Sequence, residues 1–415
     1  MGRRVAWIAL LVCSFVPELF GQVIPDSRGA QANPALLAFS RRSVVEIALH
    51  TDTLAYTNAF PLGQVFQPTW TIDLHDVTGR LRRSDLRVGA AASAGSRLAV
   101  HFRGASAGFY ASARSTNELA IPFALVELLA RGNVEDRAGS GEAVIRSGFE
   151  YGASVAGDYR DWTFGMNLAQ YIPVMHSGDG GFSFEMITTD AGFSADALLD
   201  VSILSAIDLS LHDDGTGLDL GPGFSNAALK ADLGVVRRDS LDRPIWGASL
   251  TNLTVVQART PYEYRFTGAF GASVEDALQA LADDPDTDPL TLTGDEPELT
   301  FVGESEARVA LTPGVAGFYR LSVPYVDIIP HAEVVFDSKL GAFNPGLTVV
   351  GNRFPANLFY LSYARRRPVW RATAGLRLPL RPVEVSLELA GASPRMLGPF
   401  APDGLSAALD VRIGL

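Results

Sequence analysis

The sequence alternates between apolar and polar residues in short segments along most of its length. Residues 383–389 read VEVSLEL, with an apolar side chain at every second position, and residues 370–378 (WRATAGLRL) and 97–103 (RLAVHFR) repeat the pattern. Successive side chains of a β-strand point to opposite faces, so each segment predicts a strand with one apolar and one polar face. What covers the apolar faces then decides the fold.

These segments have the length of strands that cross a membrane. The clearest hairpin spans residues 147–172, where apolar residues alternate up to a GDYRD turn and back down from it. Counting such segments gives about 14 strands, within a range of about 12 to 16, each of about 9 to 11 residues. After the first 21 residues, no run approaches the roughly 18 apolar residues of a membrane-spanning helix. The sequence therefore predicts an all-β fold.

The N-terminus reads as an export signal. Arg3 and Arg4 precede an uncharged stretch over residues 5–16, which is too short to span a bilayer as a helix. We expect a signal peptide over residues 1–21 and a single domain over residues 22–415. The only cysteine, Cys13, lies in the signal, so the mature chain has neither disulfides nor thiolate metal sites. A net charge of −12 leaves no basic footprint for nucleic acid.

A secreted sandwich of two sheets would alternate in the same way, so the polar faces matter. Here they carry rows of charged residues that suit a broad lumen, and aromatic residues gather near strand ends, as in the girdles of membrane barrels. A bilayer accepts only sheets without unpaired edges. We therefore favour a transmembrane antiparallel β-barrel of the bacterial outer membrane, with membrane lipids as its surroundings. The residues expected to face its lumen are Arg97, His101, Arg103, Arg371, Arg377, Glu384, Glu388, Asp410 and Arg412.

The last twelve residues, GLSAALDVRIGL, form an alternating strand that runs to Leu415. Leu409, Val411 and Ile413 would face lipid, while Asp410 and Arg412 face the lumen. Such a terminal strand is expected to close the barrel by pairing with the first strand, and to be the segment that the barrel-assembly machinery engages. Barrels of this kind usually end on an aromatic residue, and Leu415 departs from that pattern.

Three stretches break the alternation. Residues 32–40 (ANPALLAFS) predict a short helix capped by Asn33, with Pro34 in its first turn. Residues 121–133 have helical spacing. Residues 273–284 begin with a capping-box pattern and lead into an acidic, proline-rich stretch, so residues 273–300 predict a helical and acidic loop.

The stretches NPALLAF, IPFALVELLARGN, GLDLGPGF and SVEDALQALADD, in this order, resemble the FadL-like superfamily of outer-membrane barrels. Within that superfamily they are most similar to a branch of unknown function found in diderm bacteria. The resemblance implies a barrel of about 14 strands with residues 22–42 as a plug in the lumen, including Asn33, Pro34 and Ala35. Well-studied members take up long-chain fatty acids or other hydrophobic molecules. None of their ligand-contacting residues matches this chain closely enough to be carried over.

Two motifs partly match known catalytic or metal-binding patterns. GASAG, residues 104–108, matches a nucleophile elbow with Ser106 as the nucleophile, but that motif requires a following helix and the sequence continues as a strand. HDDGTGLDLG, residues 212–221, loosely resembles a calcium loop but lacks its ligand spacing. The six histidines show no paired metal-binding spacing. We therefore expect neither catalysis nor a metal or cofactor.

Three functions remain open at this point. The first is passive uptake, or a pore, for hydrophobic or small amphipathic solutes, which would make such a molecule a ligand. The alternative is a barrel that does not transport and serves as a structural scaffold or surface adhesin. A lipid hydrolase built on Ser106 is the third.

Overall fold

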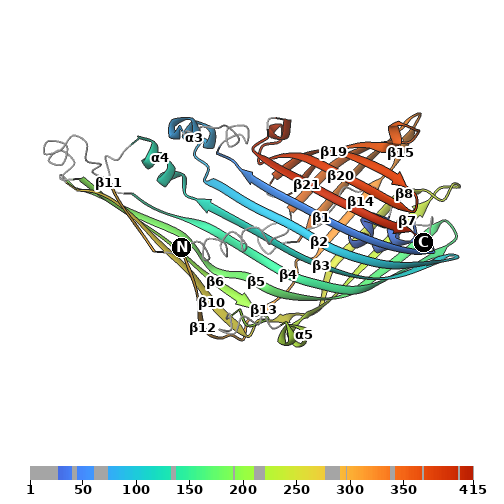
Figure 1. The fold of residues 1–415 in the computed structure, drawn as a ribbon, viewed down its shortest axis with the longest axis horizontal. Helices are drawn as coiled ribbons and strands as arrows, with labels where there is room; N and C mark the ends of the chain where they lie inside the picture. Colours follow the sequence, from blue (N-terminus) through green and yellow to red (C-terminus); the bar gives the residue numbers. More distant parts are fainter. Residues whose placement is uncertain are drawn as a thin grey trace.

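Fourteen strands close into one antiparallel barrel in the computed structural model (Figure 1). The structure describes residues 27–39, 44–59, 73–131, 137–189, 192–209, 220–275, 290–295, 297–336, 342–366, 369–400 and 402–414. The strands of the ring, each paired with the next, are β1 (Val45–Thr57), β2 (Leu86–Phe102), β3 (Ala105–Ile121), β4 (Arg137–Tyr159), β5 (Trp162–Thr189), β7 (Ala228–Arg238), β8 (Pro244–Val256), β14 (Gly314–Tyr319), β16 (Val326–Val335), β17 (Ala342–Gly351), β18 (Phe359–Arg366), β19 (Val369–Leu380), β20 (Val383–Ser393) and β21 (Gly404–Gly414).

The terminal strand closes the ring. β21 pairs with β20 on one side and with β1 on the other, from Glu46 opposite Gly414 to Tyr56 opposite Gly404. Both edges of the last strand are thus satisfied, which confirms the predicted closure and strand number. Residues 1–26, which include the expected signal, and Leu415 lie outside the described residues.

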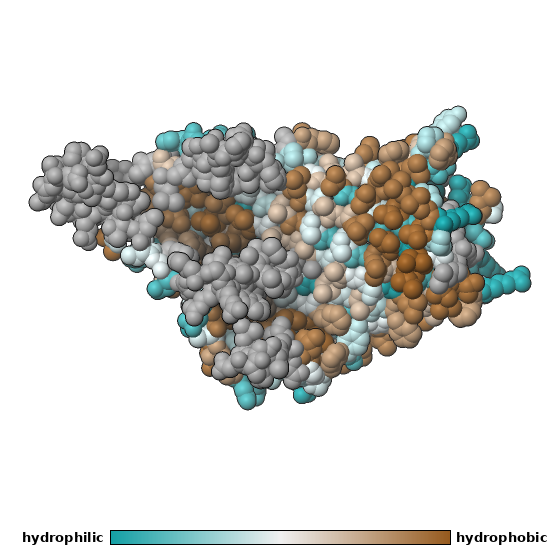
Figure 2. All heavy atoms as spheres, viewed as in Figure 1, coloured by the Kyte–Doolittle hydropathy of each residue, from teal (hydrophilic) through white to brown (hydrophobic). Residues whose placement is uncertain are grey.

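The two faces of the wall differ as the alternation predicts. On β2, Phe102 is 64% exposed on the outer face, whereas Arg97 and His101 are buried on the lumen face. Figure 2 shows apolar side chains gathered over the strands around β1 and β21, with hydrophilic side chains at the right-hand end. Burying backbone polar groups in the closed ladder while exposing apolar side chains is what a bilayer requires.

The two ends of the barrel are unequal. One end, on the right in Figure 1, carries tight turns at residues 103–104, 160–161 and 239–243, and we call it the short-turn end. The opposite, long-loop end carries α3 (Leu74–Leu81), α4 (Phe123–Arg131) and η4 (Gly398–Phe400). α4 confirms the helix predicted within residues 121–133. No described helix is long and apolar enough to cross a membrane.

A flange of strands extends the wall beyond the ring. The first half of β5 pairs with β7, but its second half pairs with β6 (Gly192–Ser205). β6 in turn pairs with β10 (Tyr262–Glu275), which pairs with β11 (Leu290–Gly294) and β12 (Glu298–Glu304). The smaller elements are β9 (Ala258–Arg259) paired with β13 (Arg308–Val309), together with β15 (Leu321–Val323), α5 (Gly221–Asn226) and η3 (Ala356–Leu358).

The helical loop predicted over residues 273–300 is wrong where the structure describes it. Ser273, read as a helix cap, lies inside β10 opposite Ser194, and residues 290–294 and 298–304 are strands. The segment forms a strand despite its capping-box pattern because the edge of β6 provides hydrogen-bond partners for its backbone. Residues 276–289 and 296 lie outside the described residues.

Candidate functional site: the lumen and its N-terminal segment

The described part of the expected plug, residues 27–39, lies inside the barrel (Figure 1). It consists of two 3-10 helices, η1 (Ser27–Gln31) and η2 (Pro34–Phe39), and η2 packs mainly on β4, β5 and β7. Leu36 packs with Phe318 and Ile329, while Leu37 lies in a cluster with Ala99 and Ala156. The segment therefore touches different sides of the wall at once.

Asn33 fixes this segment to the wall. Its Oδ1 accepts a hydrogen bond from the backbone N–H of Ala35 at 3.1 Å, the capping contact expected from the sequence. Its Nδ2 donates to the carbonyl oxygens of Ala248 at 3.2 Å and Val235 at 3.4 Å. One side chain thus starts η2 and anchors it to β7 and β8.

A pair of glycines forms the seat of η2. Gly165 on β5 and Gly234 on β7 lie opposite each other in the ladder. A Cβ at Gly165 would lie 2.2 Å from the backbone nitrogen of Ala35, and one at Gly234 would lie 2.1 Å from Oδ1 of Asn33. The plug can approach the wall this closely only because both positions lack a side chain. The pair gives no signal in the sequence, since two glycines become informative only when they are known to face each other.

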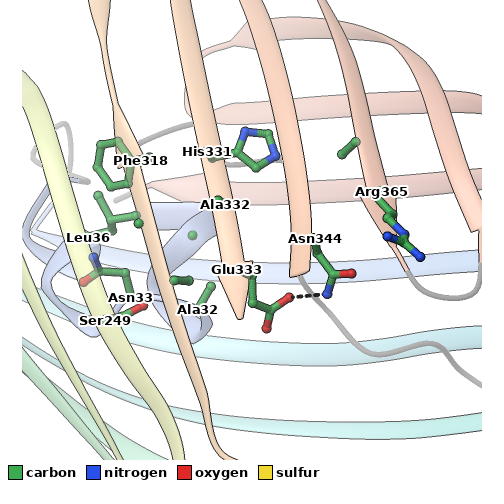
Figure 3. Close-up of a pocket in the computed structure, with 14 residues that line it drawn as sticks. Ala32, Asn33, Leu36, Ser249, Phe318, His331, Ala332, Glu333, Asn344 and Arg365 are labelled. Atoms are coloured by element: carbon green, nitrogen blue, oxygen red, sulfur yellow. Dashed lines mark hydrogen bonds between the residues drawn. The ribbon is translucent and has the colours of Figure 1, made fainter. Parts of the chain in front are cut away.

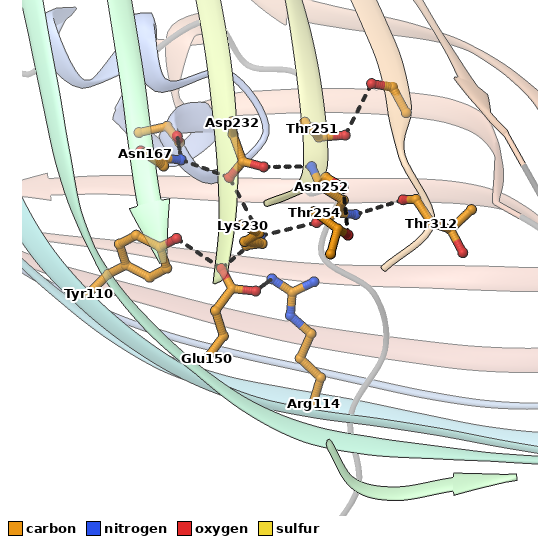
Figure 4. A network of polar contacts seen from close by, with 12 residues as sticks. Tyr110, Arg114, Glu150, Asn167, Lys230, Asp232, Thr251, Asn252, Thr254 and Thr312 are labelled. Atoms are coloured by element: carbon orange, nitrogen blue, oxygen red, sulfur yellow. Dashed lines mark hydrogen bonds and ion pairs between the residues drawn. The ribbon is translucent and has the colours of Figure 1, made fainter. Parts of the chain in front are cut away.

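A buried ionic network lies on the same part of the wall (Figure 4). The carboxylate of Glu150 on β4 receives Nζ of Lys230 at 2.9 Å, a guanidinium nitrogen of Arg114 at 3.2 Å and the hydroxyl of Tyr110 at 2.9 Å. Asp232 lies 3.5 Å from Nζ of Lys230. Two cations are thus balanced by two anions, as burial away from water demands.

This network also contacts the plug. Nδ2 of Asn167 donates to Oδ2 of Asp232 and to the carbonyl oxygen of Ala30, each at 3.3 Å. The backbone N–H of Asn252 on β8 donates to Oδ1 of Asp232 at 2.7 Å. Strands β4, β5, β7 and β8 and the N-terminal segment are therefore joined by one set of polar contacts.

A cavity of about 270 Å³ adjoins the network. Val309, Leu311 and Val335 supply an apolar side, and Arg114 and Arg146 supply cations. The side chain of Arg146 makes no hydrogen bond or ion pair with any residue that the structure describes. A smaller cavity of about 60 Å³ lies between the N-terminal segment and β8, β14 and β16–β18 (Figure 3).

Most of the residues predicted to face the lumen lie on the lumen face of the wall. Near the closure of the ring, four arginines each meet a carboxylate, and Glu388 accepts a hydrogen bond from Tyr360. The pairs are Arg97 with Glu46 at 2.9 Å, Arg371 with Asp52 at 3.5 Å, Arg377 with Glu384 at 2.7 Å and Arg412 with Asp410 at 3.0 Å.

Arg103 is the exception and a correction. β2 ends at Phe102, and Arg103 lies exposed in the turn before β3. The predicted alternation extends one residue beyond the strand, into a position where the chain already reverses.

His101 and Ser106 are cross-strand neighbours, with Nδ1 of His101 2.9 Å from Oγ of Ser106. Ser106 lies in β3, which continues as a strand to Ile121, so the helix that a nucleophile elbow requires does not follow. Within the described ranges, no three His, Cys, Asp or Glu side chains are grouped to hold a metal ion. Asp213, Asp214 and Asp219 of the calcium-like loop lie outside those ranges.

No protein-family model and no curated protein matches the chain. Among solved structures, it is similar to the toluene transporter TodX of Pseudomonas putida, a hydrocarbon channel of the FadL family, with 6% identity over 94% of each chain and a TM-score of 0.44. It is also similar to the translocator domain of the autotransporter NalP from Neisseria meningitidis, with 7% identity over 91% of each chain and a TM-score of 0.30. A third is OpdK of Pseudomonas aeruginosa, solved with vanillate, with 10% identity over 89% of this chain and 98% of that chain and a TM-score of 0.24. The function of this barrel is therefore inferred from its own lumen.

Proposed function

We propose that the chain is a bacterial outer-membrane channel for the passive uptake of small amphipathic solutes, above all solutes with one acidic group. The cavity of about 270 Å³ beside the buried ionic network is the observation that carries this proposal. It sets the guanidinium of Arg146, which forms no ion pair with a described residue, against the apolar side chains of Val309, Leu311 and Val335, while Glu333 lines the same cavity. A carboxylate would bind the guanidinium, and an apolar body would cover the opposite side.

The N-terminal segment supports a gated route. Its seat on Gly165 and Gly234 is tight, and its contacts with the wall are buried, so a solute has to pass around or displace it. The hydrogen bonds of Asn33 to Ala248 and of Asn167 to Ala30 are among those that such a displacement breaks. We propose that assembly into the membrane depends on β21, so that deleting residues 413–415 blocks closure.

Uptake into proteoliposomes tests the proposal. The refolded barrel should admit radiolabelled benzoate or heptanoate faster than the matched alcohols, and Arg146→Gln should reduce that preference. Slower migration on a gel after boiling would show that each variant had folded as a closed barrel. A folded barrel that neither conducts ions nor admits these solutes would contradict the channel and favour the scaffold or adhesin alternative.

A further inference from the structure

The rim at the long-loop end carries a surface patch of cationic side chains and neighbouring apolar side chains. We define the rim patch as Arg82, Arg83, Arg395, Met396, Leu397 and Phe400, all of them exposed. The first two follow α3 in the connection between β1 and β2, and the others belong to the connection between β20 and β21. Figure 1 shows α3 and the connection after β20 at the same end of the barrel.

Direct contacts bring the two connections together. The guanidinium of Arg395 donates to the carbonyl oxygen of Arg80 in the last turn of α3. The backbone N–H of Thr57 donates to the carbonyl oxygen of Asp403 at 3.0 Å. Arg395 is therefore held next to the helix end from which Arg82 and Arg83 project.

The positive charge of the patch is not neutralised. The nearby carboxylates are engaged elsewhere: Asp76 pairs with Arg80 at 3.0 Å, and Asp85 accepts the N–H of Phe123 at 3.1 Å. Among the described residues, Arg82 and Arg83 form no ion pair or side-chain hydrogen bond. The patch is therefore a region of positive charge in a chain whose net charge is −12.

The backbone at the helix end is also unusual. Arg82 and Arg83 have φ values of 49° and 71°, in the left-handed region that glycine adopts without strain. Arginine at both positions keeps two long cationic side chains at the rim despite that cost. Strained positions of this kind are frequent at binding sites.

The apolar half of the patch lies on the lipid-facing side of the wall. Leu397 is 75% exposed and Phe400 is 73% exposed. Phe400 stacks on Tyr363, with ring centroids 5.9 Å apart, and Tyr363 shares the outer face of β18 with the exposed Leu361. The exposed apolar side chains therefore continue the apolar outer surface of the wall up to the rim.

We infer that the rim patch binds a phosphorylated lipid of the surrounding leaflet. The guanidinium groups of Arg82, Arg83 and Arg395 receive the head-group phosphates, because their planar donors match phosphate oxygens. Acyl chains lie against Met396, Leu397 and Phe400. This inference rests on the outer-membrane placement in the proposed function, but not on solute uptake.

Native mass spectrometry of the refolded barrel in detergent, with bis-phosphorylated lipid A as the probe, tests the inference. The wild-type protein should retain bound lipid A, and R82Q/R83Q/R395Q should lose roughly tenfold or more of that binding. The matched control, R103Q/R353Q/R381Q, removes the same charge from exposed positions at the short-turn end and should bind as the wild type does.

Each alternative gives a different result. Equal binding of dephosphorylated lipid A, or no loss in the rim variant, would overturn the inference, as would competition by inorganic phosphate without any need for acyl chains. Loss of a dimer in the rim variant, with lipid binding unchanged, would assign the patch to a second copy of the chain. Lipid binding without solute uptake would contradict the proposed channel and leave the rim patch standing.

Discussion

Two parts of the lumen wall carry both acidic and basic residues, yet they use them differently. In the plug-facing wall, formed by β3, β4, β5 and β7, charges converge on one carboxylate, that of Glu150. In the seam wall, formed by β1 and β19–β21, arginines meet carboxylates in separate pairs, such as Arg377 with Glu384. Charges beneath the plug lose their water and must be satisfied by protein groups.

Burial separates Glu150 from Glu384, which belongs to the most exposed ion pair of the seam wall; other pairs there, such as Arg371 with Asp52 at 8% and 12% exposed, are nearly as buried as Glu150. The side chains of Lys230 and Glu150 are 4% and 3% exposed, whereas those of Arg377 and Glu384 are 27% and 16% exposed. Breaking a buried pair leaves an uncompensated charge, while water takes over much of the role of a partner at an exposed pair. The ion pairs of Glu150 should therefore contribute more to stability than the pair of Arg377 with Glu384.

The strongest test of this comparison is a matched pair of substitutions. Glu150→Gln leaves Lys230 and Arg114 without their shared anion and should lower the free energy of unfolding by about 3–5 kcal/mol. Glu384→Gln in the seam wall should lower it by no more than about 1 kcal/mol. Urea unfolding from lipid vesicles measures both, and equal losses would show that the two walls do not differ.

The glycine seat gives the next largest effect. Gly165→Ala places a methyl group against the backbone of Ala35, so η2 must shift at a cost of about 1–3 kcal/mol. Single-channel conductance should rise as the plug loosens. Gly157→Ala is the control, because a Cβ there meets only the carbonyl oxygen of Gly104 at 4.0 Å. Unchanged conductance in Gly165→Ala would mean that the seat does not hold the plug.

Substitutions at Asn33 distinguish its role as the cap of η2 from its role as an anchor to the wall. Asn33→Asp keeps an acceptor for the N–H of Ala35 but loses the donor to Ala248 and Val235, while Asn33→Ala loses both. Hydrogen exchange of the backbone amides of residues 34–39 should be faster in both variants. The free energy that protects these amides should fall by about 1–2 kcal/mol in the alanine variant, and by less in the aspartate variant. If the aspartate variant exchanges as the wild type does, the bonds to the wall are dispensable.

The smallest effect lies outside the lumen, in the turn after β7. Partial burial opposes ionisation of Asp239, but the backbone N–H and guanidinium of Arg243 and the N–H of Leu241 hold its pKa below the usual range. Because the folded-state pKa is lowered, the stabilisation exists above the unfolded pKa of about 4 and disappears as the pH falls through the folded value.

Asp239→Asn should therefore cost less than about 1 kcal/mol at pH 7, and nothing once the pH lies below both pKa values. Unfolding curves of the wild type and the variant at pH 7 and in acid measure this. A difference that persists in acid would assign the effect to turn geometry and not to charge.

Much of the wall could be predicted because strand geometry is local. A period of two residues assigns Arg97, Arg371 and Arg412 to the lumen face whatever the partner strands are. The same reasoning failed at Arg103, where a turn interrupts the period, and at Ser273, where a capping pattern lost to strand pairing with β6. Local signals fail where long-range pairing offers the backbone a better partner.

The sequence by itself determined that this chain forms strands with one apolar and one polar face, and that its last strand can close a ring. Only the tertiary structure decided which charges lie beneath the plug, which glycines face each other, and where arginines gather at the rim. Gly165 and Gly234 are 69 positions apart in the chain. Arg82 lies in the first quarter of the chain and Arg395 in the last. Alternation fixes the side to which a residue points, whereas strand register and loop docking fix what it meets there.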